Sequence, residues 1–195
     1  NPETIQIGLS TDTIAITAGF EGKELTVFGA LDNADPLIQR QGRYDIVVVL
    51  EGPPKDLIVR KKGRFLGIWV NRASETFSDI PSSYSLASTR SMQDITDAAT
   101  FSKLSLGVSG MVLSPKFGQQ RPTLDAFVDA LKTIKLGHGL YNERPGGVEF
   151  ISPNLFRATL DLSADVPVGN HLARAFLFRN GAFLKESSTS LQIVK

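Results

Sequence analysis

Hydrophobic positions along the chain follow two periods, one typical of β-strands and one typical of α-helices. The uninterrupted apolar run Ile46–Leu50 has the length of a strand that is buried on both faces. Gly52-Pro53-Pro54 ends it, because proline has no N–H to give to a sheet ladder. Two more strands, Leu57–Lys61 and Phe65–Val70, are expected on either side of a turn at Lys62-Gly63. We predict that these three strands form the middle of a β-sheet.

Alternating apolar and polar positions near both ends of the chain predict further strands. In the last of these segments, Asn180-Gly181 separates two strand patterns and is a strong signal for a two-residue hairpin turn. The expected strands are Thr4–Leu9, Thr13–Thr17, Glu24–Ala30, Tyr84–Ala87, Phe156–Leu162, Leu172–Arg179 and Ala182–Val194.

Between the two sets of strands the period becomes helical. One helix is expected from Ser91 to about Ser102, and a second from Pro122 or Thr123 to Gly137. The second carries an apolar face that ends at Ile134. The connection Leu31–Tyr44 is interpreted as a surface loop or a binding loop, and Asn71–Tyr84 as irregular structure.

Two architectures fit a helical section at about 90–143 between strands at 4–88 and 147–194. The strands form two β domains joined by helices, or one β-sandwich that receives the helices as an insertion. The C-terminal strands are too few to cover their own faces, and Leu172–Arg179 is apolar on both sides. We therefore expect a mainly β protein with a single domain over residues 1–195: an immunoglobulin-like antiparallel β-sandwich with a helical insertion of about two helices.

Composition excludes several classes of function. The 195 residues include 21 Lys and Arg against 20 Asp and Glu, so the net charge of +1 gives no electrostatic reason to expect nucleic acid as a partner. The chain has no cysteine, which excludes disulfides and thiolate chemistry. It also has no apolar run long enough to span a bilayer.

Residues that could carry catalysis or bind a metal are sparse. The two histidines, His138 and His171, are far apart and cannot supply the four ligands of a structural zinc site. His138 is interpreted as a polar residue after the second helix, and His171 as an exposed or edge-paired strand residue. Ser109 lacks the G-x-S-x-G spacing of a serine nucleophile. We therefore predict no catalytic residue, no metal and no cofactor.

Arg60, Lys61, Lys62 and Arg64 make the densest basic patch. These side chains could contact an anion, a lipid headgroup or a partner, or they could be the solvated end of a tight hairpin. They are our candidate partner surface. Trp69 nearby is interpreted as a core residue rather than as a platform for ligand stacking.

Several segments together resemble a known family. The most specific are GIWVN at 67–71 and YSLASTR at 84–90, supported by residues 8–31, 47–54 and 146–181. They resemble a conserved alphaproteobacterial family described as putative transmembrane proteins of unknown function. The resemblance implies a signal peptide, an extracytoplasmic domain and one C-terminal membrane helix. This sequence carries neither apolar end, so we interpret it as the domain on the periplasmic side of the inner membrane, anchored by a C-terminal helix that lies outside this chain.

The expected function is therefore non-enzymatic: a periplasm-facing domain that binds an envelope or inner-membrane protein, such as a permease. The alternative is a module that binds a small ligand or a carbohydrate, with Trp69, Tyr84 or Tyr141 as stacking surfaces. An enzyme would require His138 to meet a carboxylate inside a pocket.

Overall fold

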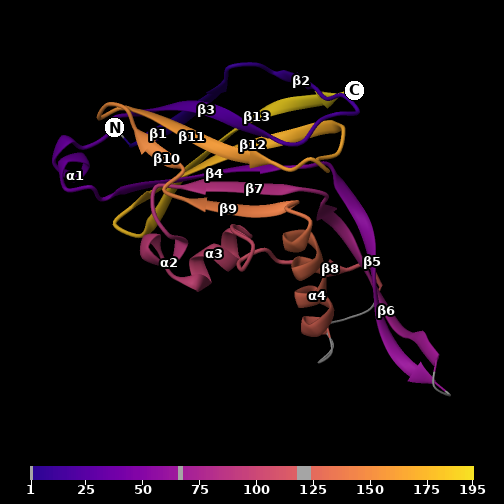
Figure 1. The fold of residues 1–195 in the computed structure, drawn as a ribbon. Coiled ribbons are helices and arrows are strands. Elements are labelled where there is room, and N and C mark those ends of the chain that lie inside the picture. The colour runs from indigo at the N-terminus through magenta and orange to yellow at the C-terminus, as the bar shows by residue number, and fades with distance from the viewer. Residues whose placement is uncertain (1, 66–67, 118–123) are drawn as a thin grey trace.

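The computed structural model describes residues 2–65, 68–117 and 124–195, with the backbone alone described over 61–65 and 68–73. The described residues form a mainly β protein with several antiparallel sheets, as the alternating patterns predict. Figure 1 shows two layers of strands with helices α2, α3 and α4 below them and a long hairpin extending to one side.

One layer is a four-stranded antiparallel sheet that combines the beginning of the chain with a later segment. Its spatial order is β1-β3-β11-β10. The strands are β1 (Thr4–Leu9), β3 (Lys23–Asp32), β11 (Leu155–Leu162) and β10 (Val148–Phe150).

The other layer is a six-stranded sheet with the order β2-β13-β12-β4-β7-β9. Its two outermost pairs, β2 with β13 and β7 with β9, are parallel, whereas the inner pairs are antiparallel. The strands are β2 (Thr13–Ala15), β13 (Ala182–Val194), β12 (Gly169–Arg179), β4 (Tyr44–Glu51), β7 (Tyr84–Ser88) and β9 (Tyr141–Pro145).

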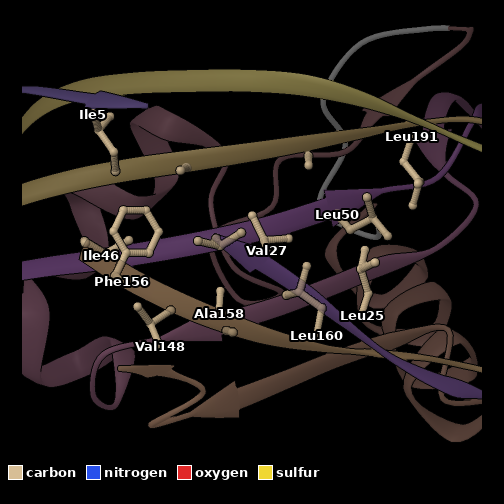
Figure 2. Packing of buried hydrophobic residues seen from close by; sticks show 14 of the residues in the cluster. Ile5, Leu25, Val27, Ile46, Leu50, Val148, Phe156, Ala158, Leu160 and Leu191 are labelled. Atoms are coloured by element: carbon tan, nitrogen blue, oxygen red, sulfur yellow. The ribbon is translucent and has the colours of Figure 1, made fainter. Parts of the chain in front are cut away.

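A continuous apolar core fills the space between these two sheets (Figure 2). Val27 and Phe156 come from the four-stranded sheet, and Ile46, Leu50 and Leu191 come from the six-stranded sheet. Because β1 and β3 meet β11 in one sheet, and β4 meets β12 and β13 in the other, this core depends on both halves of the chain.

Strand β4 is buried on both faces, as its uninterrupted apolar run predicts. Val48 and its neighbours two residues away face the core between the sheets. Val47 and Val49 face a second core on the other side of the six-stranded sheet. Three helices cover that side, namely α2 (Met92–Ile95), α3 (Ala98–Leu104) and α4 (Leu124–Gly137), while the short α1 (Pro36–Arg40) lies in the connection between β3 and β4.

The other two strands of the stretch 45–71 do not join β4, contrary to our prediction. β5 (Pro54–Phe65) and β6 (Ile68–Pro81) form a hairpin in a separate sheet with the short β8 (Ser114–Pro115). The predicted turn at Lys62-Gly63 is also wrong, because these residues pair with Asn71 and Val70 inside the ladder. The segment predicted to be irregular after Asn71 is the second half of β6.

The helices lie in the section where they were predicted, but the first predicted helix is divided in two and the apolar face of the second is shorter than predicted. The expected first helix is interrupted, because Thr96 has an extended backbone and the Asp97 side chain accepts a hydrogen bond from the Thr100 N–H, which caps a new helix. Helix α4 buries Leu124 and Leu131, but Ile134 is exposed. No helix among the described residues combines the length and the apolar character needed to cross a membrane.

Candidate functional site

The hairpin β5–β6 carries the residues that the sequence analysis proposed as a partner surface. Its ladder runs from the pair Pro54 and Pro81 to the pair Phe65 and Ile68. Arg60 lies opposite Ser74 and is exposed. The basic residues are therefore distributed along a strand and do not crowd a turn.

The base of this hairpin is fixed by apolar packing on one face. Val59 and Phe77 are buried, and with Ile80 they belong to the second core. Helix α4 lies against β5 on this side (Figure 1). Side chains alternate along the strand, so Ile58 and Arg60 are exposed on the opposite face, Ile58 to 55%.

Hydrogen bonds at the outer face join the hairpin base to the segment around β8. Lys116 Nζ lies 2.6 Å from Asp56 Oδ2, and the Lys116 N–H donates to the carbonyl of Thr76 at 2.7 Å. The Asp79 N–H also donates to Asp56 Oδ1. The hydrogen bond from Lys116 is the main cause that lowers the pKa of Asp56. Three separate segments are therefore held together where the hairpin leaves the body of the protein.

The rest of the predicted surface is described only in its backbone. Lys61, Lys62 and Arg64 take part in the β5–β6 ladder, opposite Ala73, Asn71 and Trp69 respectively. The side chains of these residues lie outside the described part of the chain. The expectation that Trp69 is a core residue therefore stays a prediction.

The two histidines lie in different surroundings. His138 is exposed just after α4, and its imidazole has no hydrogen-bond or ion-pair partner among the described residues. The arrangement that an enzyme would have required, His138 and a carboxylate inside a pocket, is therefore not found in the described part of the chain. His171 was expected to be exposed or edge-paired, but it is fully buried at the end of the core between the sheets.

Two of the three aromatic rings that were expected to serve as platforms in a carbohydrate module are buried. Tyr84 and Tyr141 are each only 1% exposed, and their rings meet edge to face with centroids 6.1 Å apart. The Tyr141 hydroxyl donates to the carbonyl of Pro81 at 2.8 Å. Both rings belong to the second core, so neither can stack on a ligand.

A pocket of about 350 Å³ lies beside the hairpin base. Its walls bring together residues from four strands and from the segment 105–114. Apart from Tyr84, no residue of this pocket was singled out from the sequence. Its residues lie far apart in the chain: Glu51 and Arg174, which form an ion pair, are 123 positions apart. The described residues that line it are Glu51, Ser78, Asp79, Ile80, Pro81, Tyr84, Ser105, Met111, Val112, Leu113, Ser114 and Arg174.

No group of three or more His, Cys, Asp or Glu residues in the described part of the chain is placed to hold a metal ion.

The family model described as putative transmembrane protein (Alph_Pro_TM) matches residues 4–195. The comparison with curated proteins found no match for this chain.

Proposed function

Because the chain belongs to this family of putative transmembrane proteins, we propose that it is the non-enzymatic, periplasm-facing domain of a single-pass membrane protein and that it binds a protein of the cell envelope through the β5–β6 hairpin. The partner is an envelope or inner-membrane protein, and an inner-membrane permease is the kind of partner that we favour.

The observation that carries this proposal is that the hairpin extends beyond β8, the third strand that pairs with its base. β8 pairs only with Phe77 and Ser78, so the described part of the ladder from Arg60 outwards has two strands. A two-stranded ribbon is marginally stable in water unless a third strand or another surface packs against it. Figure 1 shows that β5 and β6 extend well away from the two sheets. A projecting ribbon with open edges is the form in which many proteins accept a partner strand.

Side-chain chemistry at the base of the hairpin agrees with contact to a protein. Ile58 offers a large exposed apolar side chain directly beside the charged Arg60. Arginine and large apolar residues are enriched in the energetically important parts of protein interfaces. In Figure 1, β5 and β6 extend away from the C-terminus, so a membrane anchor at that end of the domain would leave the hairpin free to reach a neighbour.

We also propose that the two main sheets form an immunoglobulin-like sandwich. In the variable type of that fold, one sheet has the strands A, B, E and D, and the other has G, F, C, C′ and C″. The orders β1-β3-β11-β10 and β13-β12-β4-β7-β9 follow this arrangement when the strands are lettered in turn. The helices then lie between strands C′ and C″, and their presence accounts for the parallel pairing of β7 with β9.

A shortened hairpin tests the proposed function. Residues 62–72 would be replaced by Asn-Gly, which joins Lys61 to its ladder neighbour Ala73 and retains the buried Val59. The tagged full-length protein and this variant would be recovered from membranes after chemical crosslinking, with circular dichroism and melting to verify the fold. We expect a defined envelope protein to be recovered with the wild type and lost with the folded variant. Equal recovery of that protein with both, or no recovery above a mock preparation, would overturn the proposal.

The matched control is a change on a different face of the molecule. Phe28 is 46% exposed on β3, in the four-stranded sheet. Phe28→Ser therefore removes an exposed apolar side chain without touching the hairpin, and it should leave the recovery of the partner unchanged.

A further inference from the structure

Polar residues that line the pocket beside the hairpin base have hydrogen-bonding capacity that no described residue fills. Asp79 has no hydrogen-bond or ion-pair partner for its carboxylate among the described residues. Arg174 is held by Glu51 (Nη1 to Oε1, 3.0 Å) and by Glu186 (Nε to Oε1, 2.8 Å), which leaves Nη2 free within the described structure. Among the residues that line the pocket, Asp79 and the second oxygen of Glu51 can therefore accept further hydrogen bonds, and Nη2 of Arg174 can donate.

Tyr84 adds a buried donor to the same wall. Its hydroxyl accepts a hydrogen bond from the Gly107 N–H at 2.9 Å, and no described residue accepts the hydroxyl proton. Burial raises the pKa of Tyr84, so the hydroxyl stays protonated and remains a donor. A buried donor without an acceptor is unfavourable, and a bound ligand can supply that acceptor.

Asp79 has a backbone conformation that favours glycine. Asp56 in β5 faces both Ser78 and Asp79 in β6, so β6 carries a bulge at this point. Asp79 has a φ of 54°, the left-handed conformation for which bulges of this kind usually use glycine. Bulges often redirect a side chain at a functional site. Here Asp79 lines the pocket and is exposed.

We propose that this pocket binds a neutral polyhydroxylated molecule, a sugar or a polyol, through Asp79 and Glu51 as acceptors and Tyr84 and Arg174 as donors. Its volume of about 350 Å³ lies within the range of about 300–1,000 Å³ that is usual for small-ligand sites. The apolar side chains of Ile80, Met111 and Leu113 provide a wall for the carbon skeleton.

The hydrogen-bonding groups of the pocket favour a neutral ligand over an anion or an ammonium ion. An anion would be repelled by the carboxylates of Asp79 and Glu51. An ammonium ion would satisfy those carboxylates, but it would face the charge of Arg174 and leave the Tyr84 proton without an acceptor. A hydroxyl group both donates and accepts, so a molecule with several hydroxyls can satisfy both kinds of group at once.

Titration of the labelled protein followed by amide NMR tests the proposal. The probes are D-glucose, N-acetyl-D-glucosamine and myo-inositol, with butylammonium and acetate as comparators. We expect at least one neutral probe to shift the amides of Asp79, Ser105 and Val112 in a saturable way. A response to butylammonium or acetate alone, or no response to any probe, would overturn the proposal. A trisaccharide that binds more tightly than its monosaccharide would identify an envelope polysaccharide as the source of the ligand, and equal affinities would identify a free small molecule.

Two glycine substitutions separate ligand binding from backbone conformation. Asp79→Gly relieves the left-handed strain and removes the carboxylate, so the fold should be retained while affinity for the best probe falls about tenfold or more. Asn180→Gly relieves the same kind of strain (φ 50°) at the β12–β13 turn, away from the pocket, and should leave affinity unchanged. Wild-type affinity in Asp79→Gly would contradict the assignment. Asp79 lies at the base of β6, outside the projecting residues 58–76. Ligand affinity and recovery of the partner are separate measurements, so failure of this proposal can be distinguished from failure of the proposed function.

Discussion

Phe156 packs directly over Gly29, its cross-strand partner in the four-stranded sheet. The Phe156 ring is fully buried in the core between the sheets (Figure 2), and a β-carbon at position 29 would overlap its outer carbon atoms. Glycine at this position therefore creates the space in which the ring lies.

We predict that Gly29→Ala destabilises the protein by about 1–3 kcal/mol, because the ring must move within a close-packed core. The free energy of unfolding in urea measures the effect. The control is Gly8→Ala in the neighbouring strand β1, where no heavy atom lies within 4 Å of an added β-carbon. That change should alter stability by no more than about 0.5 kcal/mol. Equal effects at the two positions would show that the ring does not depend on Gly29.

Val48 provides a second test, at the centre of the six-stranded sheet. It is fully buried in β4 and faces the core between the sheets. We predict that Val48→Asp prevents folding or lowers stability by several kcal/mol, on the order of 4, because an unpaired carboxylate would be buried. Val168 is 45% exposed, so Val168→Asp is the matched control and should melt within a few degrees of the wild type. A near-native melting temperature for Val48→Asp would contradict the central position of β4.

Elements that depend on a few neighbouring residues could be predicted from the sequence. Asn180 and Gly181 both have positive φ, 50° and 81°, which is the backbone that a two-residue hairpin turn requires. These two residue types were therefore sufficient to predict the position of the β12–β13 turn from the sequence. In β11, the residues from Phe156 to Leu162 alternate in burial as their apolar and polar positions predict.

The hairpin β5–β6 shows why other elements could not be predicted. Lys62 and Gly63 have the composition of a turn, but a basic residue and a glycine can also continue the strand in a projecting two-stranded ribbon. The ladder contains two register shifts, at Lys55/Leu57 and at Lys61/Lys62. Bulges of this kind depend on how two strands fit together, so neither strand shows them by itself.

The pocket could not have been predicted because its residues come together only through the pairing of strands that are far apart in the chain. Asp79 has no local pattern that distinguishes it from a turn residue. Glu51 and Arg174 meet only because β4 pairs with β12. His171 was predicted wrongly because histidine after a turn is usually exposed, whereas here the alternation of β12 directs it into the core beside Ala173 and Leu191.

His171 should make stability depend on pH. Its Nε2 lies 2.8 Å from the Pro167 carbonyl and so carries the proton, while Nδ1 has no hydrogen-bond partner within the described structure. Burial lowers the pKa of His171 below its ordinary value of 6.5. The unfolded chain therefore takes up a proton at a higher pH than the folded protein does. Stability is complete above pH 6.5 and is lost as the pH falls from there toward the folded-state pKa.

Melting temperatures between pH 8 and pH 5 measure this dependence. We predict that His171→Gln, which removes the titrating group, reduces the loss of stability on acidification relative to the wild type. The matched control is His138→Gln, at the exposed histidine after α4. A wild-type pH dependence in His171→Gln would show that other groups cause it.

The final prediction compares two ion pairs that differ in the burial of the acid. Arg90 donates from Nε and Nη2 to the two oxygens of Asp45, at 3.0 and 2.9 Å, and Arg157 donates to Glu149 at 3.1 Å. The arginine side chains are 51% and 47% exposed, but the Asp45 side chain is 4% exposed and that of Glu149 64%.

Arg90→Ala leaves the buried Asp45 carboxylate with Thr89 Oγ1, which donates to Asp45 Oδ1 at 2.7 Å, as its remaining side-chain donor. We predict a loss of about 2–3 kcal/mol for Arg90→Ala, measured by urea unfolding, because a buried charge then lacks its counterion. Arg157→Ala should cost less than about 1 kcal/mol, since an exposed pair is screened by water. Adding Asp45→Asn to Arg90→Ala should restore part of the loss, because a neutral amide is less costly to bury. If the two single arginine variants lose the same amount of stability, burial of the carboxylate does not determine the strength of the Arg90–Asp45 pair.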